Sequence, residues 1–177
     1  MPNIEDILKR AKPRQKSVWV CLAGDLLAEV DRLERELREV GEGWSPDSLA
    51  ATDPREKIAK RIKSVREQMK KAETEFAFRS IGDRAWSDLV AAHPPKKQGP
   101  GGQTLMWDPD TFPRALIAAS AVDPVMTPEQ LDALFEVLNE GQRTELWDCA
   151  YAVNTEATSI PFSLSASGIL SSLTDGK

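Results

Sequence analysis

The fold is decided by two charged stretches, DLLAEVDRLERELREVG (residues 25–41) and PREKIAKRIKSVREQMKK (residues 54–71). In both, the apolar residues advance by steps of 4, 3, 4 and 3, which places them on one stripe of an α-helix. The two stripes are Leu26, Val30, Leu33, Leu37 and Val40, and Ile58, Ile62, Val65, Met69 and Ala72. We therefore expect two amphipathic helices.

Local signals bound these helices. Gly41 and Gly43 are expected to end the first one. Asp53 is a capping residue and is followed by Pro54, a proline at the first helical position, so the second helix should begin there.

The two helices differ in charge. Residues 25–42 carry seven acidic and three basic side chains, whereas residues 54–71 carry eight basic and two acidic ones. Helices of opposite charge joined by a connection of about ten residues should fold back antiparallel, with their apolar stripes in the seam. Exposed charge pairs contribute well under ~1 kcal/mol each, so the charges select the pairing and the seam provides the stability.

Short β-rich runs flank the helices. Residues 17–22 precede the first helix, which Asp25 is well placed to cap. Residues 74–79 follow the second helix and alternate Phe76 and Phe78 with small or polar neighbours, which is typical of a half-buried strand. At the base of a hairpin, the two runs should pair antiparallel.

The remaining chain is predicted to be helical. One helix opens at Gly82-Asp83 and ends at His93, and three more follow within residues 112–121, 127–138 and 141–153. Thr127 and Gln130 have the spacing of a capping box. The expected fold is mainly α: an antiparallel helical hairpin with a two-stranded β element at its base, plus a C-terminal helical bundle. We divide the chain into an N-terminal helix and basic linker (1–16), a strand–hairpin–strand–helix unit (17–95), a flexible loop (96–106), an acidic helical subdomain (107–158) and a tail (159–177).

Composition favours a globular protein of about one domain, because 41% of the 177 residues are hydrophobic and 29% are charged. No apolar run approaches the ~20 residues of a membrane helix, and residues 1–16 lack the apolar stretch of a signal peptide, so we expect a cytoplasmic protein with no membrane partner. Cys21 and Cys149 lie far apart in sequence, which suggests neither a disulfide framework nor a zinc site.

Charge is distributed unevenly along the chain. Residues 1–106 contain 20 Lys/Arg and 17 Asp/Glu, whereas residues 107–177 contain 3 and 11. Only the N-terminal part could bind nucleic acid, through the basic helix. We interpret that helix as a solvated face opposite its acidic partner, because only Phe76 lies near it to stack on bases.

Each residue that could take part in catalysis is better explained by a structural role. His93 is the only histidine, and its place before Pro94 at a helix end favours capping or packing. The Gly-rich loop lacks the ending of a phosphate loop, and Ser167 lacks the flanking glycines of a serine hydrolase elbow. Asp108, Asp110 and Asp123 depart from the calcium-loop pattern and are interpreted as helix caps. The sequence thus predicts a non-enzymatic protein with no cofactor and no metal.

The candidate partner-binding residues are tryptophans and residues of the basic helix. Trp86 and Trp147 fit helical stripes and are predicted to be core residues. Trp44 and Trp107 lie in predicted loops and are the better interface candidates. From the basic helix we add Arg61 and Lys63 as partner-binding candidates.

Several runs follow one another in a fixed order. They are VWVCLAGDL (18–26) with the charged helix after it, FAFRSIGDRAWSDLVAAHPP (76–95) and TFPRALI (111–117), continued by VDP (122–124), LNEGQ (138–142), the helix at 146–154 and IPFS (160–163). In pattern and order, these runs resemble the tail assembly chaperones of long-tailed phages of actinobacteria. The resemblance covers residues 18–167.

The resemblance implies a non-enzymatic chaperone that coats the tape measure protein until tail tube protein polymerises around it. It further implies action in the host cytoplasm, absence from the finished virion, and family members that are often made in a short and a frameshifted long form. The sequence leaves open whether the protein forms a homo-oligomer. Two alternatives remain: a structural virion protein of the tail or connector, and a nucleic-acid-binding regulator.

Overall fold

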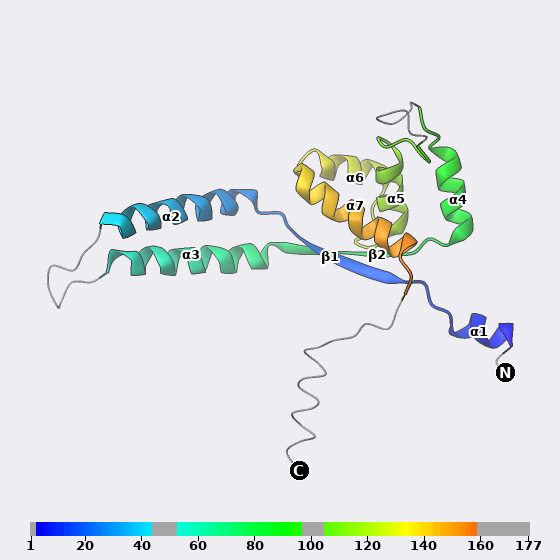
Figure 1. The fold of residues 1–177 in the computed structure, drawn as a ribbon, viewed down its shortest axis with the longest axis horizontal. Helices are drawn as coiled ribbons and strands as arrows, with labels where there is room; N and C mark the ends of the chain where they lie inside the picture. The colour runs from blue at the N-terminus through cyan, green and yellow to red at the C-terminus, as the bar shows by residue number, and fades with distance from the viewer. Residues whose placement is uncertain (1–2, 44–52, 97–104, 159–177) are drawn as a thin grey trace, which may run out of the picture.

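The computed structural model describes residues 3–43, 53–96 and 105–158 (Figure 1). Its helices are α1 (Ile4–Arg10), α2 (Gly24–Gly43), α3 (Pro54–Lys71), α4 (Asp83–Ala92), α5 (Phe112–Ser120), α6 (Pro128–Phe135) and α7 (Glu140–Thr155). Its strands are β1 (Gln15–Cys21), β2 (Glu73–Arg79) and β3 (Ala121–Asp123). The protein is mainly helical with a small antiparallel sheet, which confirms the expected class.

The sheet contains three strands in the order β1-β2-β3, and both neighbouring pairs are antiparallel. Val18 lies opposite Phe76, and Phe78 lies opposite Ala121. The prediction of a two-stranded element was therefore wrong by one strand. β3 is only three residues long, too short to show an alternating pattern, and it forms because α5 delivers it to the edge of β2.

The main core lies between one face of the sheet and the C-terminal helices. Val20, Phe76 and Phe78 point into this core and are at most 3% exposed. Leu131 of α6 and Leu146 of α7 meet them there. Strands from the segment 17–95 and helices from the segment 107–158 thus share one core.

Helix α7 is held by β1 near its start and by Arg14, the residue before β1, near its end. Near its start, Gln142 Nε2 donates a hydrogen bond of 2.7 Å to the carbonyl oxygen of Cys21. Near its end, Arg14 donates to the carbonyl oxygens of Ala152 and Glu156. The C-terminal helices therefore cover one face of the sheet.

Side-chain caps explain where α3 and α6 begin. Asp53 accepts a hydrogen bond from the backbone amide of Arg55, and Thr127 and Gln130 form the predicted capping box of α6. One expected cap is corrected, because α2 begins at Gly24 and Asp25 lies inside its first turn. Gly82, at a φ of 82°, occupies the N-cap of α4 in a conformation that favours glycine.

The predicted aspartate caps of the later helices are also corrected. The N-cap of α5 is Thr111, and Asp108 instead accepts the backbone amide of Asp110 in the turn before it. Asp123 ends β3 and caps no helix. Asx turns use the same side-chain chemistry as N-caps, so sequence alone does not separate the two.

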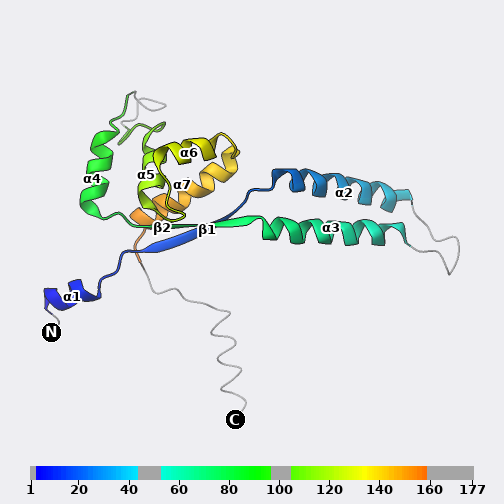
Figure 2. The same cartoon turned by 180° about the vertical axis from the view of Figure 1, so that it is seen from behind.

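Helices α2 and α3 lie side by side and project away from the sheet, as both views show (Figures 1 and 2). α2 leads away from β1, and α3 returns to β2. Helix α1 lies apart from the main core, and none of its side chains is buried. Most of the predicted flexible loop at 96–106 and the predicted tail at 159–177, with Ser167, lie outside the described residues, as does Trp44.

Candidate protein-binding groove

The seam between α2 and α3 is a hydrophobic cluster separate from the main core. Its buried members are Val30, Leu33, Ile58, Ile62 and Val65, with Leu26, Leu37, Val40 and Met69 packed against them. All the predicted stripe residues except Ala72, which is the C-cap of α3, meet here. Burial of an aliphatic side chain contributes roughly 1.5–3 kcal/mol, so the seam can hold the two helices together.

Ion pairs cross the seam at its rim. Arg61 Nη2 lies 2.7 Å from Glu29 Oε1, and Arg66 Nη2 lies 2.5 Å from Glu34 Oε1. Both arginine side chains remain more than 60% exposed, so each pair contributes under about 1 kcal/mol. The charge of Arg61, a predicted partner-binding residue, is thus already engaged within the pair of helices.

A groove runs along the outside of this pair. Its apolar part comes from Leu37 of α2 and from Ala59 and Ile62 of α3. Its charged walls are Glu34, Arg38, Lys63, Arg66, Glu67 and Lys70, four basic residues against two acidic ones. The groove has a volume of about 610 Å³. It combines an apolar floor with a net positive rim.

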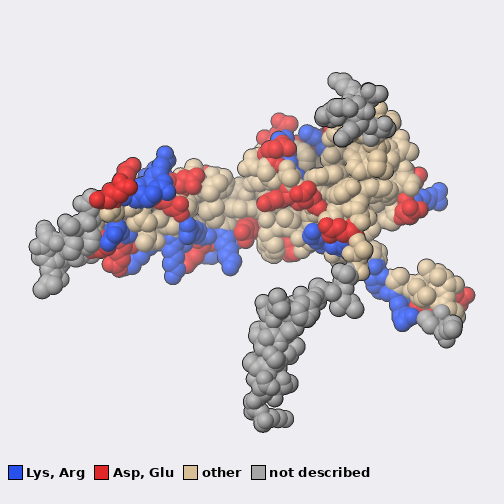
Figure 3. All heavy atoms as spheres, viewed as in Figure 1, with Lys and Arg blue, Asp and Glu red and all other residues tan. Residues whose placement is uncertain are grey.

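Lys63 is the predicted partner-binding residue that the structure places in the groove. It is exposed, and within the described part of the chain it has no ion-pair partner. Figure 3 shows Lys and Arg side chains gathered over the α2–α3 pair, with acidic side chains between them. Lys63 can therefore contact a partner without breaking an ion pair.

The other groove residues come from patterns that the sequence had already revealed. Leu37 and Ile62 belong to the apolar stripes, and Arg66 and Lys70 belong to the basic helix. What sequence reasoning missed is that they share one groove. That juxtaposition depends on how far α2 and α3 rotate about their axes in the seam.

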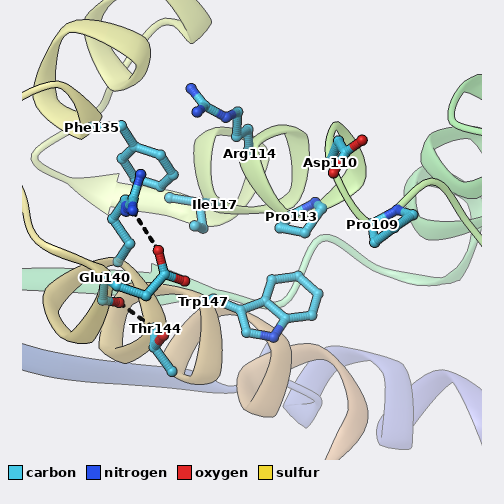
Figure 4. A pocket seen from close by; sticks show the side chains of 10 residues that line it. Pro109, Asp110, Pro113, Arg114, Ile117, Phe135, Glu140, Thr144 and Trp147 are labelled. Carbon is cyan, nitrogen blue, oxygen red and sulfur yellow. Dashed lines mark hydrogen bonds and ion pairs between the residues drawn. The ribbon is translucent and has the colours of Figure 1, made fainter. Parts of the chain in front are cut away.

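A second hollow lies between α5 and α7 (Figure 4). Arg114 and Arg143 both lie against the ring of Phe135, with guanidinium carbons 4.9 and 6.0 Å from its centroid. Arg114 is paired with Asp132, and Arg143 with Glu140. The hydroxyl of Thr144 donates to the carbonyl oxygen of Glu140. These side chains contact one another, and the hollow contains no nucleophile activated by a base.

Trp107 has a packing role. Its ring stacks on Phe112 at 4.5 Å and meets Trp86 edge-on at 6.1 Å. Trp147 and Tyr151 of α7 complete this aromatic cluster. Trp107 is half-buried, so its ring is not a free anchor in a loop. Its role in partner binding stays a prediction.

The segment between α4 and α5 is fixed where it leaves and rejoins the body. The backbone amide of Asp108 donates a hydrogen bond of 2.8 Å to the carbonyl oxygen of His93. Lys96 Nζ lies 2.8 Å from Asp108 Oδ2. The hydrogen bond from Lys96 lowers the pKa of Asp108, a residue only 2% exposed. His93 Nδ1 lies 2.9 Å from the Thr111 hydroxyl, so the histidine ring holds the start of α5.

Carboxylates and thiols are the other groups that could carry chemistry. Within residues 3–43, 53–96 and 105–158, no group of three or more His, Cys, Asp or Glu could hold a metal ion. Burial raises the pKa of the Cys149 thiol, which keeps it protonated at neutral pH. None of the described helices is long and apolar enough to cross a membrane.

Comparisons of the chain with known protein families, with curated proteins and with solved structures find no match. The groove, the exposed surfaces and the residue pattern are therefore the features that bear on function.

Proposed function

We propose that this protein is a non-enzymatic assembly chaperone that binds an elongated helical partner along the α2–α3 pair, acting as an antiparallel helical hairpin. The observation that carries the proposal is the groove with an apolar floor and four basic residues on its rim, on a pair of helices that projects from the body. Grooves of this kind accept the apolar face of an amphipathic helix.

The charge of the rim indicates the chemistry of the partner. Residues 54–71 carry eight basic and two acidic side chains, so α3 attracts an acidic helix more strongly than a basic one. A groove of this size makes a contact at the small end of protein interfaces, which suits weak and reversible binding. Many such contacts along a repetitive helical partner would raise the overall affinity through multivalency.

The resemblance to phage tail assembly chaperones supplies the identity of the partner. On that basis we propose the tape measure protein of a long-tailed phage, bound in the host cytoplasm and released when tail tube protein covers the same surface. Release then needs only competition by mass action. The protein would be absent from finished virions.

Capture of purified tape measure protein from the same genome tests this proposal. We expect Lys63→Glu/Lys70→Glu, which reverses two charges on the groove rim, to weaken capture at least about tenfold, equivalent to ~1.4 kcal/mol. The matched control is Lys57→Glu/Lys71→Glu, which makes the same change of charge on the same helix outside the groove residues.

Addition of tail tube protein should then release the captured tape measure protein. Equal loss in both double variants would show that overall charge, and not the groove, governs binding. Failure of the wild-type chain to capture tape measure protein, together with its presence in purified particles, would make it a structural virion protein instead.

A further inference from the structure

Strand β1 lies at the edge of the sheet, and two hydrogen bonds next to it determine which way its backbone groups point. Leu22 N donates to Ala72 O, and Ser80 N donates to Arg14 O. Backbone groups alternate in direction along an antiparallel strand. The amides and carbonyls of even-numbered residues in β1 therefore face β2, and those of odd-numbered residues face outward.

The outward groups form a short, well-defined edge. Gln15, Ser17 and Trp19 each present an amide and a carbonyl, and within the described residues no hydrogen bond reaches them. Beyond Trp19 the edge is blocked, because the Cys21 carbonyl accepts Gln142 Nε2. The free edge is thus centred on Ser17. Free edges of this kind readily pair with another strand.

Large exposed hydrophobic residues are frequent in the part of the sequence around β1. Of the nine large hydrophobic residues that are exposed in the described part of the chain, six lie between residues 4 and 27. They are Ile4, Ile7, Leu8, Trp19, Leu22 and Leu27. Trp19 is 59% exposed on the face of the sheet opposite the main core. Because Trp19 belongs to the strand itself, its ring can contact the side chains of a second strand that pairs with this edge.

We propose that β1 is the interface of a homodimer, in which two copies pair antiparallel with Ser17 of one copy opposite Ser17 of the other. This register places Gln15 opposite Trp19. The outward amides and carbonyls of Gln15, Ser17 and Trp19 then all form hydrogen bonds between the two copies, and no other residue is needed. An interface around a two-fold axis must be complementary to itself, and an edge of three residues with one at its centre meets that condition.

The charge on the strand fits the same register. Lys16, the only charged residue of β1, lies opposite Val18 and not opposite itself.

The dimer does not depend on the proposed function, although it would serve it. Antiparallel β1 strands would point the two α2–α3 pairs in opposite directions. One dimer would then present two grooves to an elongated partner.

Disulfide trapping tests the register. Cα atoms in a hydrogen-bonded antiparallel pair lie about 5.5 Å apart, within bridging distance. In a Cys21→Ser background, we expect Ser17→Cys to form a disulfide-linked dimer under mild oxidation. The control is Ala77→Cys, opposite Ser17 on β2, where the two cysteines of the same dimer would lie about 14 Å apart. Equal or absent cross-linking at the two positions overturns the proposal.

The mass of the full chain gives a second readout. Wild-type protein should sediment at twice the 19.6 kDa of the chain. Ser17→Pro removes an outward amide that β2 does not use, so it should leave a folded monomer. A wild-type monomer at high micromolar concentration, or a dimer that survives Ser17→Pro, overturns the proposal. Circular dichroism checks the fold of the proline variant; if the variant is unfolded, the cysteine pair decides alone.

Discussion

The separation of the seam from the main core makes a specific prediction for Leu33→Ala. Leu33 is 3% exposed and packs among Val30, Ile58, Ile62 and Val65, whereas the main core contains none of these residues. Loss of a buried leucine costs 2–5 kcal/mol in large cores. The seam is a single layer whose neighbours can move into the space, so we expect about 2–3 kcal/mol.

This cost should appear in one part of the molecule only. A loss of 2–3 kcal/mol corresponds to about 30- to 150-fold faster amide exchange for residues that open with the seam. We therefore expect that increase in α2 and α3, measured by hydrogen exchange, while the central amides of β2 and α7 keep their wild-type rates. Leu146→Ala, in the main core, is the matched control and should act mainly on the sheet and α7.

Two results would refute this reasoning. Equal acceleration throughout the chain after Leu33→Ala would show that the seam and the main core open as one unit. Unchanged exchange in α2 and α3 would show that Leu33 is not packed as the structure indicates.

Three further predictions concern the body. The pKa of Asp108 in the folded state is below its ordinary value. Its contact with Lys96 therefore stabilises the fold fully at pH values above the unfolded-state pKa. This stabilisation is lost as the pH falls through the folded-state pKa. Urea unfolding of Asp108→Asn should therefore differ most from wild type near neutral pH, and the difference should shrink as the pH falls below about 4; a pH-independent difference would contradict this. Gln142→Ala removes both a capping side chain and the bond to Cys21, so we expect a loss of about 1–2 kcal/mol and a melting temperature lower by about 3–6 °C in calorimetry, and an unchanged value would show that neither bond stabilises the fold. Cys149 is buried and its thiol pKa is raised, so at mildly alkaline pH a thiol reagent should label Cys21 first and Cys149 only on unfolding; equal rates would contradict this.

Sequence reasoning succeeded where structure depends on neighbours along the chain. The steps of 4 and 3 in the stripes reflect the 3.6-residue turn of a helix, and they predicted the seam members correctly from Leu26 to Met69. Asp53 and the Thr127–Gln130 box act within three residues, so they were also readable. The alternation of Phe76 and Phe78 identified β2 as half-buried for the same reason.

Contacts that join distant parts of the chain could not be predicted in the same way. Trp107 lies in a loop, as predicted, but its contacts with Phe112 and Trp86 depend on how the segments at α4 and α5 meet. The groove around Lys63 depends on the rotation of two helices, which their stripes restrict only roughly.

By itself, the sequence determined which segments are helical, where most of them begin, and that two helices of opposite charge would meet along their apolar stripes. Only the tertiary structure decided that the C-terminal helices cover the sheet, that α2 and α3 project from it, and that β1 keeps a free edge. Helix periodicity and capping depend on residues three or four positions apart, which any chain carries in its sequence. A free strand edge or a shared groove depends on which segments that are distant in sequence come into contact. Those contacts are decided by the packing of the whole chain.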